Sequence, residues 1–148
     1  MSNLRAAVVG ETVVLVTNAT NPEQEEWDAY LVKLGEHLNA RAGKPGRLIV
    51  FAGGGTPSSS MRLGLRNVVK ERPLQTAVIS DSAVVRGIIG VFALFVKGTK
   101  PYGVRDWKAA LEYVGFPYDK LNDLVNEVKA MDSQIGGCVA VADLVKTK

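Results

Sequence analysis

The residues of this chain that could do chemistry gather in one segment, Phe51–Arg62, which reads FAGGGTPSSSMR. An apolar stretch leads into three glycines, and hydroxyl side chains follow just before a helical pattern. Backbone amides that are left open at the start of a helix form a binding site for anions such as phosphate. The residues that such a site would use are Gly54, Gly55, Thr56, Ser58 and Ser59. The segment therefore raises the hypothesis of a phosphate site or a surface for an acidic partner.

The same segment has a plainer interpretation as the start of a helix. Thr56 is a good N-cap, Pro57 suits the first helical position, and the glycines give the backbone freedom after a buried strand. The glycines do not form a P-loop, because no Lys followed by Ser or Thr comes after them. They are also consecutive, unlike the spaced glycines of a dinucleotide-binding loop. A capped turn and an anion site both stay open.

Basic residues continue from this segment along the expected helix. Arg62, Arg66 and Lys70 recur every four residues and therefore share one helix face. Such a face fits an acidic partner or a phosphate group. It fits an ordinary solvated surface equally well.

Few other residues suggest catalysis or metal binding. His37 is the only histidine, and the sequence places no serine or cysteine beside it, so a catalytic triad is unsupported. Cys138 is the only cysteine, and its neighbours are apolar rather than the cationic groups that activate a thiol. The acidic residues lack the spacing of a calcium-binding loop. We therefore expect a protein that is not an enzyme and has no metal site and no cofactor.

Composition limits the class of protein. A chain of 148 residues can form one domain with its own core. The net charge of +3, without clustered basic and aromatic residues, argues against a nucleic-acid partner. The longest apolar run, Gly87–Val96, is about half of what a membrane span needs, and a single cysteine suits a reducing compartment. We expect a cytoplasmic protein with no membrane span.

Hydrophobic periodicity predicts alternating strands and helices. The β-branched runs Ala6–Val9 and Val13–Thr17 predict a hairpin, and Asn21 is a good N-cap for the first helix. Further strands are expected at Arg47–Ala52, Gln75–Ile79 and Pro101–Val104, and further helices after the serines and at Ala83–Val96, Trp107–Val114 and Tyr118–Met131. This order predicts one α/β domain with a mixed, mostly parallel sheet of about five strands. Residues 1–117 would form this domain, and residues 118–148 a C-terminal helical extension packed on it, in which CVAVADLV fits a strand or a helix.

The expected helix Ala83–Val96 is apolar on all sides, with Arg86 as its only charge. A helix of this kind must be buried by its own domain or by something else. We expect Phe92 and Phe95 to take part in a homodimer or in a contact with a partner, because aromatic side chains dominate interfaces. Burial of both rings inside the monomer is the alternative.

Four stretches of this order carry a resemblance to a known family. They are NPEQEEWDAYLVKL, RLIVFAGGGTPSSSMRLGL, AVISDSAVVRGIIGVFALF and DWKAALEYVGFP, and together they span about Val13–Pro117. In order and pattern they resemble the STAS superfamily, the sulfate-transporter and anti-sigma-factor-antagonist domains. The likeness is closer to the divergent bacterial STAS-like proteins, which are also compared with CRAL-TRIO lipid-binding domains.

The resemblance implies a function. STAS domains are typically not enzymes and bind partner proteins, and in the antagonists a serine at the start of the second helix is phosphorylated. In this chain Ser58 and Ser59 are the possible phosphorylation sites, and they come later after the strand than the serine of the antagonists. We therefore expect a non-catalytic regulatory module of a bacterial cytoplasm that binds a partner protein. The alternative is a binder of a small hydrophobic ligand or lipid, suggested by the CRAL-TRIO likeness and by the apolar helix.

Overall fold

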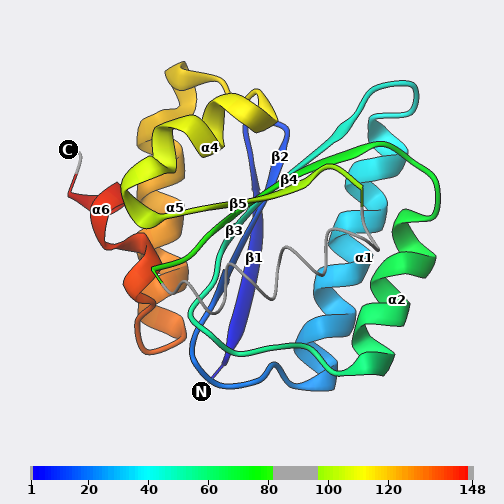
Figure 1. Cartoon of the computed structure of the whole chain (residues 1–148), viewed down its shortest axis with the longest axis horizontal. Helices are drawn as coiled ribbons and strands as arrows, with labels where there is room; N and C mark the ends of the chain where they lie inside the picture. The colour runs from blue at the N-terminus through cyan, green and yellow to red at the C-terminus, as the bar shows by residue number, and fades with distance from the viewer. Residues whose placement is uncertain (1, 82–96, 147–148) are drawn as a thin grey trace.

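The computed structural model describes residues 2–81 and 97–146, and they form one five-stranded sheet with helices on both faces (Figure 1). The strands are β1 (Leu4–Val9), β2 (Thr12–Thr17), β3 (Gly46–Phe51), β4 (Leu74–Ile79) and β5 (Thr99–Tyr102), and they lie in this order across the sheet. Strand β1 pairs antiparallel with β2, while the other neighbours pair in parallel. The prediction of an α/β fold with a mixed, mostly parallel sheet of about five strands is confirmed.

The first two strands form the hairpin that the sequence predicted. Gly10 and Glu11 connect them, and both have positive φ angles, 54° and 56°. Two consecutive residues of this kind make the tight turn that matches the twist of paired strands. The hairpin puts β1 at one edge of the sheet and β2 next to the parallel strands.

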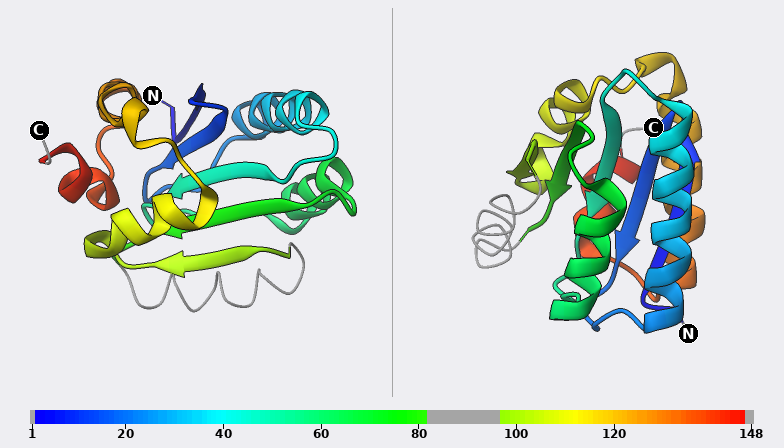
Figure 2. Two further views of the ribbon diagram at one scale, coloured as in Figure 1. Left: turned by 90° about the horizontal axis from the view of Figure 1, so that it is seen from above. Right: turned by 90° about the vertical axis from the view of Figure 1, so that its right-hand side faces the viewer.

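The helices divide between the two faces. Helices α1 (Gln24–Ala40) and α2 (Ser59–Val69) cover one face, and Figure 2 shows them side by side in front of it. Helices α4 (Trp107–Val114), α5 (Leu121–Gln134) and α6 (Ala142–Val145) cover the other. Short 3-10 turns lie at Val104–Asp106, Tyr118–Lys120 and Val139–Val141. Each parallel connection through α1 and α2 returns on the same face, as right-handed crossovers that move across the sheet in one direction must.

The start of α1 differs from its prediction. Glu23, rather than Asn21, is the N-cap residue, and it forms a capping box with Glu26. The Glu26 carboxylate also accepts hydrogen bonds from the backbone amides of Asn3 and Leu4. Because one carboxylate can cap the helix and hold the beginning of β1, the tertiary contact decides where the helix begins.

The C-terminal segment is helical, as the sequence predicted for Tyr118–Met131; only the tail after Met131 was left undecided between strand and helix. Helices α5 and α6 lie with α4 on one face of the sheet, where the apolar residues of these helices form a continuous core with those of β1 to β4. Helix α4 has the bounds Trp107–Val114 that the sequence predicted, and Gly115 ends it in the left-handed conformation with a φ of 75°. Residues 118–146 thus pack on the same sheet as the residues before them.

The expected helix Ala83–Val96, and with it Phe92 and Phe95, lies outside the described residues. Within residues 2–81 and 97–146, no helix has the length and apolar character that crossing a membrane requires.

Candidate functional site

Three exposed serines stand at the N-terminal end of α2. Ser58 is the N-cap of this helix, and its Oγ accepts a hydrogen bond of 3.2 Å from the Met61 amide. The prediction that Thr56 caps the helix is therefore wrong. Ser60 lies 3.1 Å from Ser58, hydroxyl to hydroxyl. We call Ser58, Ser59 and Ser60, all exposed, the serine surface.

Residues 53–57, here called the glycine loop, fit tightly against the connection between β2 and α1. A Cβ atom on Gly53 would overlap the backbone of Thr17 and Asn18, and a Cβ on Gly55 would overlap the carbonyl oxygen of Thr20. Glycine is required at both positions because two backbones approach each other more closely than any side chain allows. The glycine loop is thereby fixed by packing.

The amides of the glycine loop are used within the protein. Gly55 donates to the Asn18 carbonyl at 3.0 Å, and Gly53 donates to the Thr17 hydroxyl at 3.3 Å. The Thr56 amide donates to the Asn21 side chain at 2.9 Å. Amides that already have acceptors are not open for a phosphate group, so this geometry favours the interpretation of these three residues as architecture.

The three basic residues of α2 do not act as one group. Arg62 is half-buried, and its guanidinium donates to the Pro57 carbonyl at 2.9 Å and to the Ser59 Oγ at 3.0 Å. Arg66 is exposed, and Lys70 is the exposed C-cap residue with a φ of 53°. Arg62 therefore helps to fasten the start of the helix, while Arg66 and Lys70 carry the outward-facing positive charge.

An apolar pocket lies between α1, α2 and the sheet, directly beneath the glycine loop. Its volume is about 150 Å³, and Trp27, Leu65 and Val78 form part of its wall. Gly55 and Arg62 also line it, and Arg62 donates to Ser59, so the pocket adjoins the serine surface. Sequence reasoning did not find this pocket, because its wall combines residues from two helices and four strands.

One polar side chain in the pocket is unsatisfied. Thr76 faces the pocket from β4 with only 5% of its surface exposed, and no described residue offers its Oγ1 a hydrogen bond. Another polar group in the wall, the indole nitrogen of Trp27, donates to the Met61 carbonyl at 2.9 Å. The Trp27 ring also meets Tyr30 edge to face, with 5.2 Å between centroids. Thr76 thus places a buried hydroxyl without a described partner in a largely apolar wall.

A second hollow, of about 300 Å³, lies beside the edge strand β1 and has charged walls. Charged side chains of this hollow hydrogen-bond to backbone groups along the free edge of β1. The Lys33 ammonium donates to the Ala6 carbonyl at 2.9 Å, and the Glu26 carboxylate accepts from the first amides of β1. Arg5 donates to Gln134 at 2.7 Å. Charged groups that occupy the free edge of a sheet prevent it from pairing with another strand.

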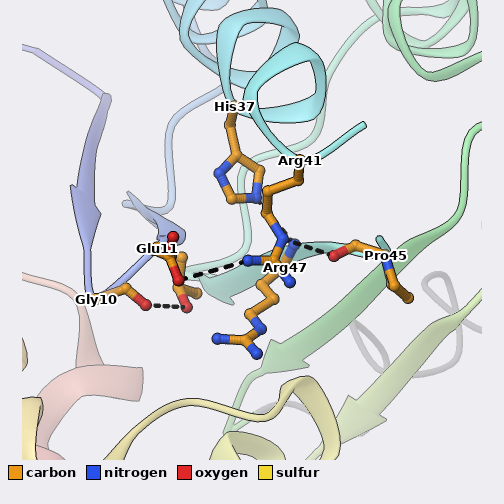
Figure 3. Close-up of polar contacts among 7 residues, drawn as sticks. Gly10, Glu11, His37, Arg41, Pro45 and Arg47 are labelled. Atoms are coloured by element: carbon orange, nitrogen blue, oxygen red, sulfur yellow. Dashed lines mark hydrogen bonds and ion pairs between the residues drawn. The ribbon is translucent and has the colours of Figure 1, made fainter. Parts of the chain in front are cut away.

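His37 is the centre of a polar cluster at the amino end of β3 (Figure 3). The ring is buried, and its Nε2 accepts a hydrogen bond of 3.0 Å from the Arg47 amide, which requires the neutral ring. Burial, together with the charges of Arg41 and Arg47, lowers the pKa of His37 below its usual value. Arg41 in turn contacts Glu11 at 3.7 Å and donates to the Pro45 carbonyl. The ring therefore holds α1 to the start of β3.

Cys138 lies at the opposite end of β3, where its thiol contacts the Phe51 carbonyl at 3.7 Å. Burial raises the pKa of this thiol to about 11, so it stays protonated at neutral pH. Arg47 and Phe51 are separated by about 13 Å of strand, which keeps Cys138 and His37 too far apart to act as a nucleophile and its base. Across the described part of the chain, no three acidic, histidine or cysteine side chains come together as a metal site would need.

Comparison with known proteins finds no family model, no curated protein and no solved structure that matches this chain. The class that the structure shows is an α/β fold with a mixed sheet of five strands.

Proposed function

We propose that this chain is a STAS-like, non-catalytic regulatory module that binds a partner protein through the serine surface. The order of its elements, a hairpin followed by parallel strands and helices, agrees with the resemblance that the sequence carries. The observation that supports the proposal most is the way the serine surface is presented. The three exposed hydroxyls lie at the start of α2, and the loop before them is packed closely against the connection between β2 and α1. Binding sites on such well-packed elements are more precise than sites on loose loops.

Ser59 is the best placed of these serines for phosphorylation. Its Oγ already accepts a hydrogen bond from the Arg62 guanidinium, and it occupies the first position of α2. A phosphate group there would meet a positive side chain and the positive end of the helix dipole, both of which favour it. Ser58 is less suited, because its Oγ serves as the helix cap.

We propose a non-catalytic protein because of how two residues are used, His37 and Cys138, which could otherwise have served as a general base and a nucleophile. His37 uses its Nε2 to accept from a backbone amide, and Cys138 is a buried, protonated thiol. Each is committed to the fold at a different end of β3. Neither is available as a general base or a nucleophile.

The test is affinity capture from cells with tagged protein and two pairs of matched variants. Ser60→Trp adds bulk to the serine surface, and Ser133→Trp adds the same bulk to an exposed position of α5 on the opposite side. The double variant Arg66→Glu with Lys70→Glu reverses the outward charge of α2, and Lys108→Glu with Lys129→Glu makes the same charge change on α4 and α5.

Exposed substitutions of this kind change the free energy of unfolding by about 0.5 kcal/mol or less, so lost binding would report on the surface. We expect one protein to be captured by the wild type and by both control variants, and to be lost with Ser60→Trp and with the α2 charge reversal. Equal capture by all five proteins would refute the proposed surface, and capture of nothing by the wild type would refute the proposed function.

A further inference from the structure

The pocket beneath α2 has the size of a single small ring. A cavity of about 150 Å³ with apolar walls is large enough to bind benzene, and the pocket has this volume. The Trp27 ring and the side chains of Leu65 and Val78 supply apolar contact. Because the Trp27 nitrogen is already bonded to the Met61 carbonyl, the indole offers an apolar surface to an occupant.

Thr76 contributes a buried hydroxyl group to this mostly apolar pocket. Thr76 lines the pocket, its hydroxyl is buried, and within residues 2–81 and 97–146 nothing hydrogen-bonds to it. A hydroxyl can donate one hydrogen bond and accept two, and a buried hydroxyl with no partner is a cost to the folded state. Thr12, the other buried threonine among the described residues, begins β2 and donates from its hydroxyl to the Gly10 carbonyl at 3.3 Å. Arg72 Nε also lacks a partner but lies away from the pocket, so among the described residues Thr76 is the pocket-lining side chain whose buried polar atom is unsatisfied.

We propose that this pocket binds a small, mainly apolar molecule, about the size of a six-membered ring, whose single hydroxyl or carbonyl oxygen hydrogen-bonds to the Thr76 Oγ1. The apolar walls favour the body of the molecule, and Thr76 selects for the oxygen. This gives the small-ligand alternative a location and a chemistry. It does not depend on the partner-binding function, because the ligand site is tested on the isolated protein.

Phenol and benzene form a matched pair of probes for this site, since they differ by one hydroxyl. The experiment is a titration of the full chain with each, followed by NMR of the methyl groups of Leu65 and Val78. The methyl groups of Leu124 and Val128, on the opposite face of the sheet, are the internal reference. We expect saturable shifts at Leu65 and Val78 only, with phenol binding about fivefold more tightly than benzene, the ratio that one net hydrogen bond supplies.

Thr76→Val keeps the shape of the side chain and removes the hydroxyl. In this variant a buried phenol hydroxyl has no partner and is penalised, so benzene should bind more tightly than phenol, which reverses the wild-type order. Thr12→Val, which removes a buried hydroxyl away from the pocket, should leave the wild-type order unchanged.

Two results would overturn the proposal. Absence of saturable shifts at Leu65 and Val78 with both probes would show that the pocket takes no ligand of this class. The same phenol-to-benzene ratio in the wild type and in Thr76→Val would show that Thr76 does not recognise the oxygen. Ala52→Leu, which fills the pocket from the residue that follows β3, should abolish the shifts; if it fails to fold, Thr76→Val still decides.

Discussion

Two regions of this molecule bury polar groups, and they differ in whether those groups have hydrogen-bond partners. In the cluster around His37, the ring accepts from the Arg47 amide, and Arg41 contacts Glu11 and the Pro45 carbonyl. In the pocket beneath α2, the Thr76 hydroxyl is buried and finds no partner among the described residues. Both regions lie on the α1 and α2 side of the same sheet.

The difference separates a structural polar group from a candidate for binding. A buried polar group that is satisfied contributes to the stability of the fold, whereas an unsatisfied one costs stability and needs another explanation. Removing the polar atom should therefore destabilise the protein at His37 and stabilise it at Thr76. The glycine loop is part of this comparison because Gly55 lines the pocket.

Of the substitutions considered, the largest loss of stability is expected at Gly55, which lines the pocket. In Gly55→Ala the new Cβ would overlap the Thr20 carbonyl, so the glycine loop and its neighbour must move apart. We expect the free energy of unfolding to fall by about 3 kcal/mol or more, at the upper end of overpacking effects. Denaturant unfolding followed by circular dichroism measures it.

The matched control is Gly35→Ala, in the middle of α1. There the nearest atom to a new Cβ is a Val68 methyl at 3.6 Å, an ordinary contact. Alanine should stabilise the helix by about 0.5–1 kcal/mol. If Gly55→Ala behaved as well as Gly35→Ala, the close approach of the two loops would be wrong.

The satisfied region is tested by His37→Phe, which keeps a ring and removes its acceptor. The Arg47 amide would then lose its hydrogen-bond partner. An amide left buried in this way costs about 1–3 kcal/mol. We expect a loss of that size in thermal or denaturant unfolding, and a variant as stable as the wild type would show that the ring only fills space.

The same hydrogen bond predicts a dependence of stability on pH. The pKa of His37 is lowered in the folded state, so the unfolded chain binds more protons as the pH falls below about 6.5. The contribution of His37 is therefore complete above that pH and is lost as the pH falls toward the lowered folded-state pKa, with a slope of at most about 1.4 kcal/mol per pH unit. The difference in unfolding free energy between wild type and His37→Phe isolates this slope from the carboxylates. A difference that stays constant from about pH 7.5 to about pH 5 would contradict it.

Local patterns predicted the fold well where neighbours in sequence decide the structure. The hairpin at Gly10 and Glu11, the strand after Pro73 and the end of α4 at Gly115 all follow from local rules. The caps were less predictable, because a tertiary contact chose Glu23 over Asn21 and packing of the glycine loop left the cap to Ser58. The C-terminal helix α6 forms where its apolar residues meet the sheet, which no local signal specifies.

The candidate site was predictable only in part. The sequence placed hydroxyl groups and Arg62 at the start of a helix, and the structure has them there. It did not reveal that the amides of Gly53 and Gly55 are already bonded, or that His37 is buried. Thr76 gave no signal at all, since one threonine in an otherwise mostly apolar strand is ordinary. Its significance depends on which atoms lie around it.

The most direct test of the contrast between the two regions is the stability of Thr76→Val, measured by denaturant unfolding with and without phenol. Without phenol, we expect the variant to be more stable than the wild type by about 1 kcal/mol, because an unsatisfied buried hydroxyl is gone. With phenol, the wild type should gain more stability than the variant, because a ligand stabilises the protein that binds it better. A variant that is less stable than the wild type without phenol, or that gains as much from phenol, would contradict the account.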